Sequence, residues 1–200
     1  MKIFMKILTA TTVIAVLLSS IPFESTCKEL EKDVFRLHIL ANSDSDSDQN
    51  LKLYVRDTIL NEFSSMYDGV KTKADAIEIT ESMLPQIEKT AMKALREKDC
   101  DYEVCASVTN KFFDTRYYED FTMPAGVYDT LEIRIGEAEG KNWWCVMYPT
   151  LCVGASSEFS MKENLSESEY NVISSENVVY KFKIVEYFEK VSSFFSDVTH

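Results

Sequence analysis

The sequence predicts an α+β fold in which an antiparallel sheet is covered on one face by a helical hairpin. Apolar and polar residues alternate at residues 35–39, 102–108 and 131–135, the period-two pattern of half-buried strands. Between the first two stretches, apolar residues recur every three or four positions over two consecutive segments. A composition of 46% hydrophobic and 12% aromatic residues is sufficient for a folded core.

The first 26 residues have the character of a secretory signal. Lys2 and Lys6 supply positive charge ahead of an uncharged apolar region at residues 7–18. Because a membrane span needs about 20 apolar residues, we predict a cleaved signal peptide at 1–26, with an uncleaved anchor as the alternative. Cys27 raises the alternative of a lipoprotein, but the residues before it lack the small-residue pattern of such sites.

The predicted domain, residues 27–153, begins with a strand at 35–39 that places Arg36 and His38 on its polar side. An acidic loop, Asn42–Asn50, leads from this strand into the first helix. Such a loop suits a helix N-terminus because carboxylates complement the helix macrodipole.

Two helices follow the acidic loop. Ser45 and Asp48 form a capping box for the first, and Gly69 is predicted to end it. The second begins at a cap formed by Thr72 and Asp75 and runs to about residue 98. Pro85 lies inside it and predicts a kink or a break into two shorter helices.

The acidic loop also resembles the start of a calcium-binding loop, because Asp44, Asp46 and Asp48 alternate with serines. However, Gln49 stands where the sharp turn needs glycine, and Val55 stands where a bidentate glutamate is needed. We therefore predict a polar loop that caps a helix, and no metal site.

Strands return in the second half of the domain. After the strand at 102–108, two more are predicted at 129–135 and 142–148. Gly136 and Gly140 bracket the turn between the last two, which we predict to form a β-hairpin.

The C-terminal residues divide into two parts. Residues 154–176 are rich in Ser, Glu and Asn, and we predict a flexible linker. Residues 177–200 carry apolar residues at helical spacing, which predicts an amphipathic helix. A strand over Val178–Ile184 is an alternative that periodicity does not exclude.

Charge and motifs exclude several classes of function. The net charge of −12 disfavours nucleic acid and anionic lipid as partners. No metalloprotease, P-loop, nucleophile-elbow or zinc motif is present. The only histidines are His38 and His200. We predict no catalytic residues, no cofactor and no small-molecule substrate; a catalytic pair of His38 with a cysteine is the alternative.

Two cysteines are predicted to pair. Disulfides persist outside the cytoplasm, and Cys145 and Cys152 share one dense block of aromatic and apolar residues. A bridge requires Cα atoms about 4.4–6.8 Å apart, so the chain must reverse near Tyr148–Pro149, where a cis peptide is favoured. The alternative is two buried thiols.

Adjacent residues of a strand point to opposite faces, so Trp143 and Trp144 cannot both enter the core. Because tryptophan is enriched at binding hot spots, we predict a partner-binding surface that contains Arg134, Asn142, Trp143 and Trp144.

Two stretches, RLHILANSDSDSDQNLKLYVRDTIL (36–60) and PAGVYDTLEIRIGEAEGKNWWCVMYPTLC (124–152), resemble the stage II sporulation protein R family. The resemblance runs from about Asp33 to Leu151. It implies a secreted, non-enzymatic signal of endospore-forming bacteria, exported by the forespore into the space between forespore and mother cell. The implied partner is a membrane-embedded aspartic protease of the mother cell, which then removes the pro-sequence of the early mother-cell sigma factor.

Two other classes of protein remain as alternatives: a secreted hydrolase or thiol enzyme that uses His38 and a cysteine, and a structural protein of the cell envelope. The sequence leaves the oligomeric state open.

Overall fold

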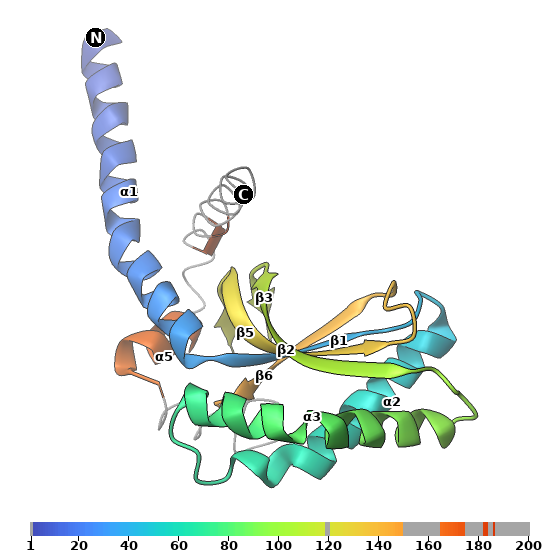
Figure 1. Ribbon diagram of the computed structural model, residues 1–200. Helices are drawn as coiled ribbons and strands as arrows, with labels where there is room; N and C mark the ends of the chain where they lie inside the picture. The colour runs from blue at the N-terminus through green and yellow to red at the C-terminus, as the bar shows by residue number, and fades with distance from the viewer. Residues whose placement is uncertain (1, 119–120, 150–164, 175–181, 184–185, 187–200) are drawn as a thin grey trace, which may run out of the picture. The chain divides into compact units, whose positions relative to one another are not determined.

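The computed structural model describes residues 2–118, 121–149, 165–174, 182–183 and 186. The chain divides into two compact units, each described here by itself. The sheet unit contains residues 32–111 and 128–165, and the terminal unit contains residues 1–31, 112–127 and 166–200. The elements, in chain order, are α1 (Lys2–Asp33), β1 (Phe35–Leu40), α2 (Asp46–Phe63), the 3₁₀ helix η1 (Ser64–Tyr67), α3 (Lys73–Arg96), β2 (Val104–Phe113), β3 (Arg116–Tyr117), β4 (Thr122–Met123), β5 (Gly126–Ile135), β6 (Asn142–Tyr148) and α5 (Glu167–Ser174) (Figure 1).

The predicted α+β class is confirmed, but the sheet is mixed rather than antiparallel. Among the described residues the central sheet has four strands in the order β2-β5-β1-β6. β1 runs parallel to β5 and antiparallel to β6. The predicted hairpin between residues 129–135 and 142–148 is therefore wrong, because β1 lies between these two strands.

The connection between β5 and β6 explains this error. β5 and β6 still run in opposite directions, so a short turn rich in glycine joins them as it would join a hairpin. This turn passes over the end of β1: the Glu139 amide donates to the Asn42 carbonyl (3.2 Å) and the Gly140 amide to the Ala41 carbonyl (2.9 Å). A Cβ at Gly140 would overlap the carbonyl oxygen of Ser43, so glycine is required for this close approach.

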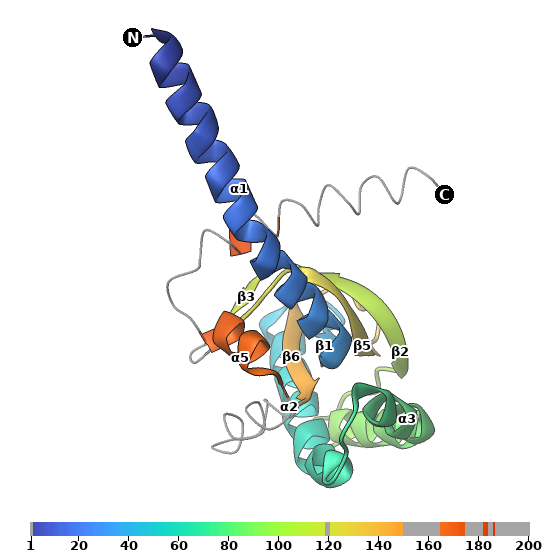
Figure 2. The ribbon, with the colours of Figure 1, turned by 90° about the vertical axis from the view of Figure 1, so that its left-hand side faces the viewer.

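The two helices α2 and α3 pack against each other and cover one face of the sheet, as predicted (Figure 1, Figure 2). Both predicted caps are present: the Ser45 hydroxyl accepts from the Asp48 amide (3.2 Å), and the Thr72 hydroxyl accepts from the Asp75 amide (3.1 Å). α3 continues through Pro85 without a break.

The first helical segment ends in two steps. α2 stops at Phe63, η1 continues it to Tyr67, and Gly69 then adopts a left-handed conformation with φ 79°. This agrees with the predicted stop at Gly69, because a left-handed residue after a helix is most readily glycine.

The core of the sheet unit lies between the sheet and the two helices. It contains alternate residues of β1 and β5 together with the inner faces of α2 and α3, among them Phe35, Leu37, Ile39, Val55, Ile59, Ile87, Leu95, Leu131 and Ile133. The opposite side of β1 is also buried, since Arg36 is 0% exposed and His38 3%. The prediction of a half-buried β1 is therefore wrong: β1 is an interior strand, covered on both faces.

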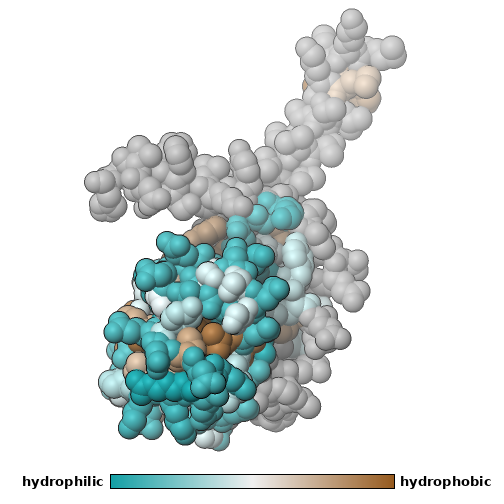
Figure 3. Space-filling model, turned by 90° about the vertical axis from the view of Figure 1, so that its right-hand side faces the viewer, coloured by the Kyte–Doolittle hydropathy of each residue, from teal (hydrophilic) through white to brown (hydrophobic). Residues whose placement is uncertain are grey.

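The side drawn in Figure 3 is mainly hydrophilic, with small hydrophobic areas between the polar ones. Among the described helices, none combines the length and the hydropathy that a membrane-crossing segment requires.

The terminal unit contains α1, the short β3–β4 ladder and α5. α1 runs without interruption across the predicted boundary at residue 26, with Pro22 inside it. α5 lies within residues 154–176, so the predicted linker is wrong for residues 167–174. Its start is a capping box in which Ser166 N donates to the Glu169 carboxylate (2.8 Å) and Glu169 N donates to the Ser166 hydroxyl (3.3 Å). Most of the predicted helix at 177–200 lies outside the described residues, although Phe182 and Lys183 are helical.

Cys145 is bonded in a disulfide, whereas Cys27, Cys100 and Cys105 are not. The predicted partner, Cys152, lies outside the described residues, so the pairing stays a prediction. The Tyr148–Pro149 peptide is cis, as expected for a chain reversal there.

The contact at Gly140 generates a stability prediction. We expect Gly140→Ala to lower the free energy of unfolding by about 1–3 kcal/mol, because the new methyl group has no room. Amide hydrogen exchange at residues 139 and 140 should also accelerate, since the turn moves away from β1. The control is Gly69→Ala, which costs about 1–2 kcal/mol through its left-handed backbone but leaves those amides protected. Unchanged exchange in a Gly140→Ala protein would contradict the close approach.

Candidate partner-binding surface

Three of the four predicted binding residues lie together on the face of the sheet opposite α2 and α3. Leu40, at the end of β1, pairs with Arg134 on β5 and with Asn142 on β6. His38, two residues earlier, pairs with Trp144. We call this surface the polar face; it is formed by His38, Lys111, Glu132, Arg134, Asn142 and Trp144.

The fourth predicted residue, Trp143, lies on the other side of the sheet. It is half-buried against the core of the sheet unit, and the guanidinium of Arg56 on α2 lies 4.9 Å from its ring centre. The two tryptophans therefore point to opposite faces, as predicted. Trp143 packs against the core and the helices and does not belong to the polar face.

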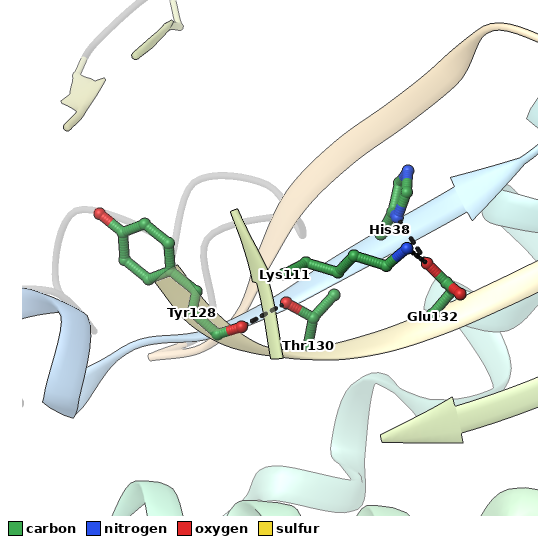
Figure 4. A network of polar contacts seen from close by, with 5 residues as sticks. All are labelled: His38, Lys111, Tyr128, Thr130 and Glu132. Carbon is green, nitrogen blue, oxygen red and sulfur yellow. Dashed lines mark hydrogen bonds and ion pairs between the residues drawn. The ribbon is translucent and has the colours of Figure 1, made fainter. Parts of the chain in front are cut away.

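A buried network of charges underlies the polar face. One carboxylate oxygen of Glu132 accepts from His38 Nδ1 (3.1 Å) and pairs with Lys111 Nζ (2.7 Å) (Figure 4). The side chain of Glu132 is 7% exposed and that of Lys111 is 39% exposed. The lysine thus compensates the buried carboxylate, which would be costly to hold there without a cation.

His38 is neutral in this setting. Burial lowers the pKa of His38 from its ordinary value near 6.5, and the opposing attraction of Glu132 is smaller. Hydrogen bonding with the Asn142 side chain acts in the same direction as Glu132, raising the pKa of His38, and does not outweigh burial. The hydrogen bond to Glu132 places the proton of the neutral ring on Nδ1, which donates to that carboxylate.

Trp144 lies flat on this imidazole. The two ring centres are 3.9 Å apart and the planes differ by 2°. The tryptophan is half-buried, so one part of its surface is held by His38 and another remains accessible. A ring that is already fixed loses little side-chain entropy when a partner covers it, which favours binding.

Arg134 and Asn142 are exposed on the same face as Trp144; Asn142 is two residues before it on β6, and Arg134 lies on β5, beyond β1. With Lys111, Arg134 gives this face two accessible cations on a chain whose net charge is −12. The combination offers an apolar ring, a planar donor for a carboxylate or carbonyl, and an amide. These groups suit recognition of a protein surface.

The acidic loop holds the start of β6 in place. Asp44 accepts from the Lys141 amide (2.6 Å), and the buried Lys52 donates to the Lys141 carbonyl (2.8 Å). Asp48 accepts from Asn42 (2.8 Å) and from the hydroxyl of Ser43. These hydrogen bonds, from Asn42 first, lower the pKa of Asp48. The loop therefore anchors the residue that precedes Asn142.

Burial lowers the pKa of Lys52, and its ammonium is satisfied by the Lys141 carbonyl and by Gln49 (2.6 Å). In the described part of the chain, no cluster of three or more His, Cys, Asp or Glu side chains is arranged to hold a metal ion. The carboxylates of Asp44 and Asp48 are instead used in hydrogen bonds to the chain.

The sequence predicts Arg134, Asn142 and Trp144 on this face but not the network of charges beneath them. The alternation of β1 places His38 on the polar side of its strand, and no pattern in the sequence points to Glu132 or Lys111 as its partners. Glu132 is 94 residues from His38 in the chain, so no local pattern joins them. The available signal was the alternation of β5, which places Glu132 and Arg134 on one face.

The neutral state of His38 generates a prediction of pH dependence. Because its folded pKa is below the unfolded value near 6.5, its contribution to stability is complete above pH 6.5. As the pH falls below 6.5, the unfolded chain binds the proton first and stability is lost, by at most about 1.4 kcal/mol per pH unit.

Urea unfolding at pH 7.5, 6.5 and 5.5 measures this loss. We expect His38→Gln to flatten the dependence, whereas His200→Gln, at the only other histidine, retains it. A His38→Gln protein with the slope of the wild type would contradict a neutral, buried His38.

Comparison with known proteins identifies the family. A family model described as stage II sporulation protein R matches residues 31–158. The chain is 34% identical over 134 residues to the stage II sporulation protein R of Bacillus subtilis (strain 168). This match covers 67% of the present chain and 58% of the relative, so the chain spans less than two thirds of the relative's length. No solved structure is significantly similar to the chain. The chain therefore belongs to the stage II sporulation protein R family.

Proposed function

We propose that this protein is an exported sporulation signal that activates a membrane-embedded aspartic protease of the mother cell. It acts from the space between forespore and mother cell, and the activated protease removes the pro-sequence of the early mother-cell sigma factor. Membership of the sporulation family is the observation that carries this proposal. The signalling role and the partner are what the family resemblance implies for this chain.

The polar face supports the proposal by offering a binding surface. Trp144 is held flat against His38, and Arg134 and Asn142 are exposed on the same face of the sheet. A ligand activates a protease only if it binds the active state better than the inactive one. A rigid surface suits this task, because it fits one arrangement of the partner and fits another poorly.

The described cysteines of the sheet unit, Cys100, Cys105 and Cys145, do not favour a thiol enzyme. Cys105 alternates along β2 with Val104 and Ala106, which face the helices, so its side chain lies on the same side as His38. However, β5 separates β2 from β1, and two strand spacings amount to about 10 Å. A nucleophile and its base need a separation of about 2.6–3.2 Å. Cys100 packs against the helix side, and Cys145 is in a disulfide.

The test of the function is reconstitution in bacteria that do not sporulate. The protein is produced together with the protease and the pro-sigma factor from the same source, and the sigma factor is followed by immunoblot. We expect the shortened sigma factor only when this chain is exported; the control chain lacks residues 2–20 and stays in the cytoplasm. Absence of cleavage despite confirmed export would contradict the proposal.

Trp144→Ala should remove the centre of the binding surface. Truncating a hot-spot residue weakens binding by about 2 kcal/mol or more, roughly thirtyfold, so we expect the shortened sigma factor to be lost at limiting expression. Circular dichroism and urea unfolding establish that the variant is folded. A well-folded Trp144→Ala protein that still supports full cleavage would remove Trp144 from the proposed surface.

Arg134→Ala provides a second test with a matched control. Arg134 is exposed and makes no hydrogen bond or ion pair with another residue in the described part of the chain, so its loss should change stability by no more than about 0.5 kcal/mol. We expect several-fold weaker sigma-factor cleavage. Arg96→Ala, at an arginine that is 71% exposed on α3, should leave cleavage unchanged. Equal effects of the two substitutions would indicate a general charge effect rather than a specific contact.

A further inference from the structure

One side of α1 is buried between Phe23 and Leu30. Near the N-terminus of this helix Phe4 is 70% exposed, and Met5 and Ile7 are each 60% exposed. From Phe23 onward one side of the helix is buried: Phe23 is 7% exposed, and Cys27 and Leu30 are 0% exposed. These three residues follow a spacing of four and three, so they form a single stripe. The folded part of the terminal unit therefore includes α1 from Phe23.

Residues near the C-terminus cover this stripe. The ring of Phe182 meets that of Phe23 edge-on, with centres 5.0 Å apart and planes at 71°. Cys27 completes the cluster, and Val172 of α5 packs against it. Phe23 is thus an integral part of a small core that joins the two ends of the chain within this unit.

The helix is weakest directly before Phe23. Pro22 has no backbone N–H, so the Leu18 carbonyl lacks the bond that an uninterrupted helix would give it. Ser20, directly before Ile21, is a small residue of the kind that a signal-cleaving enzyme accepts immediately before its cut, although Leu18, three positions before the cut, is not small. A protease needs an extended substrate, and this segment is the least costly place in α1 to unwind.

We propose that export processing cuts between Ser20 and Ile21, so that the mature protein retains Phe23. A membrane-bound signal peptidase adds water across this peptide bond, leaving a carboxylate on Ser20 and an amine on Ile21. This replaces the boundary at residue 26, because a cut after Thr26 would remove Phe23 and uncover Phe182 and Cys27. It also excludes a lipid on Cys27, whose side chain is fully buried. The inference rests on the proposed export.

The direct test is the N-terminus of the exported chain. The full chain, with a C-terminal affinity tag, is purified from the extracytoplasmic fraction, and its intact mass and N-terminal sequence are determined. We expect a chain that begins at Ile21. A chain that begins after Phe23, a lipid-modified Cys27, or an exported chain that still begins at Met1 would each overturn the proposal.

Two substitutions examine the cut itself. A bulky residue beside the cut blocks processing, so Ser20→Tyr should accumulate the unprocessed chain. Thr26→Tyr, which places the same side chain beside the rival cut, should be processed like the wild type. The reverse pattern would place the cut after Thr26 and overturn the proposal.

A stability comparison judges the role of Phe23 independently of export. In the full chain, Phe23→Ala should lower the thermal midpoint and expose the Cys27 thiol to alkylation, while Phe4→Ala changes neither. Equal midpoints and equal alkylation for the two variants would overturn the retention of Phe23. Failure of export would count against the proposed function. The N-terminal sequence of the exported chain and the processing of the two tyrosine variants test only the position of the cut.

Discussion

The position of β1 between β5 and β6 is the constraint on which the rest of the sheet unit depends. The turn after β5 crosses the end of β1 and maintains this position. There the amides of Glu139 and Gly140 donate to the carbonyls of Asn42 and Ala41, the residues that follow β1. Only a glycine at position 140 permits the backbones to approach this closely. Because β1 is then an interior strand, its polar residues are buried together with its apolar ones. The neutral His38, the carboxylate of Glu132 and the fixed ring of Trp144 all follow from that placement.

The hydrogen bonds of the acidic loop also support the residues of the polar face. Asp44 and Lys52 hold both backbone groups of Lys141, and β6 begins at the next residue. Asn142 in turn contacts His38, on which Trp144 rests. The conspicuous run of aspartates and serines is therefore a structural anchor for the surface that we propose to bind the partner. A binding surface supported in this way is set by the fold rather than by the partner.

The features that depend on local interactions could be predicted from the sequence. The capped helices, the stop at Gly69, the opposite directions of the two tryptophans and the cis Tyr148–Pro149 peptide all depend on neighbouring residues. The strand order could not be predicted, because a glycine turn joins antiparallel strands in the same way whether they pair directly or enclose a third. The burial of His38 depends on the strand order, so it could not be predicted from the sequence either. α5 was missed because a serine-rich composition concealed the Ser166–Glu169 cap.

The pairing of β1 also determines when this protein can fold. His38 meets Glu132 across 94 residues of chain, and β6 is later still, so the first strand has no neighbour until most of the sequence is available. Contacts this distant in sequence form slowly, because a long loop must close before they are made. If the proposed export moves the N-terminal part of the domain across the membrane first, β1 would be delivered well before its partners. During such an export the topology would delay folding and would keep the polypeptide unfolded until most of it has crossed the membrane.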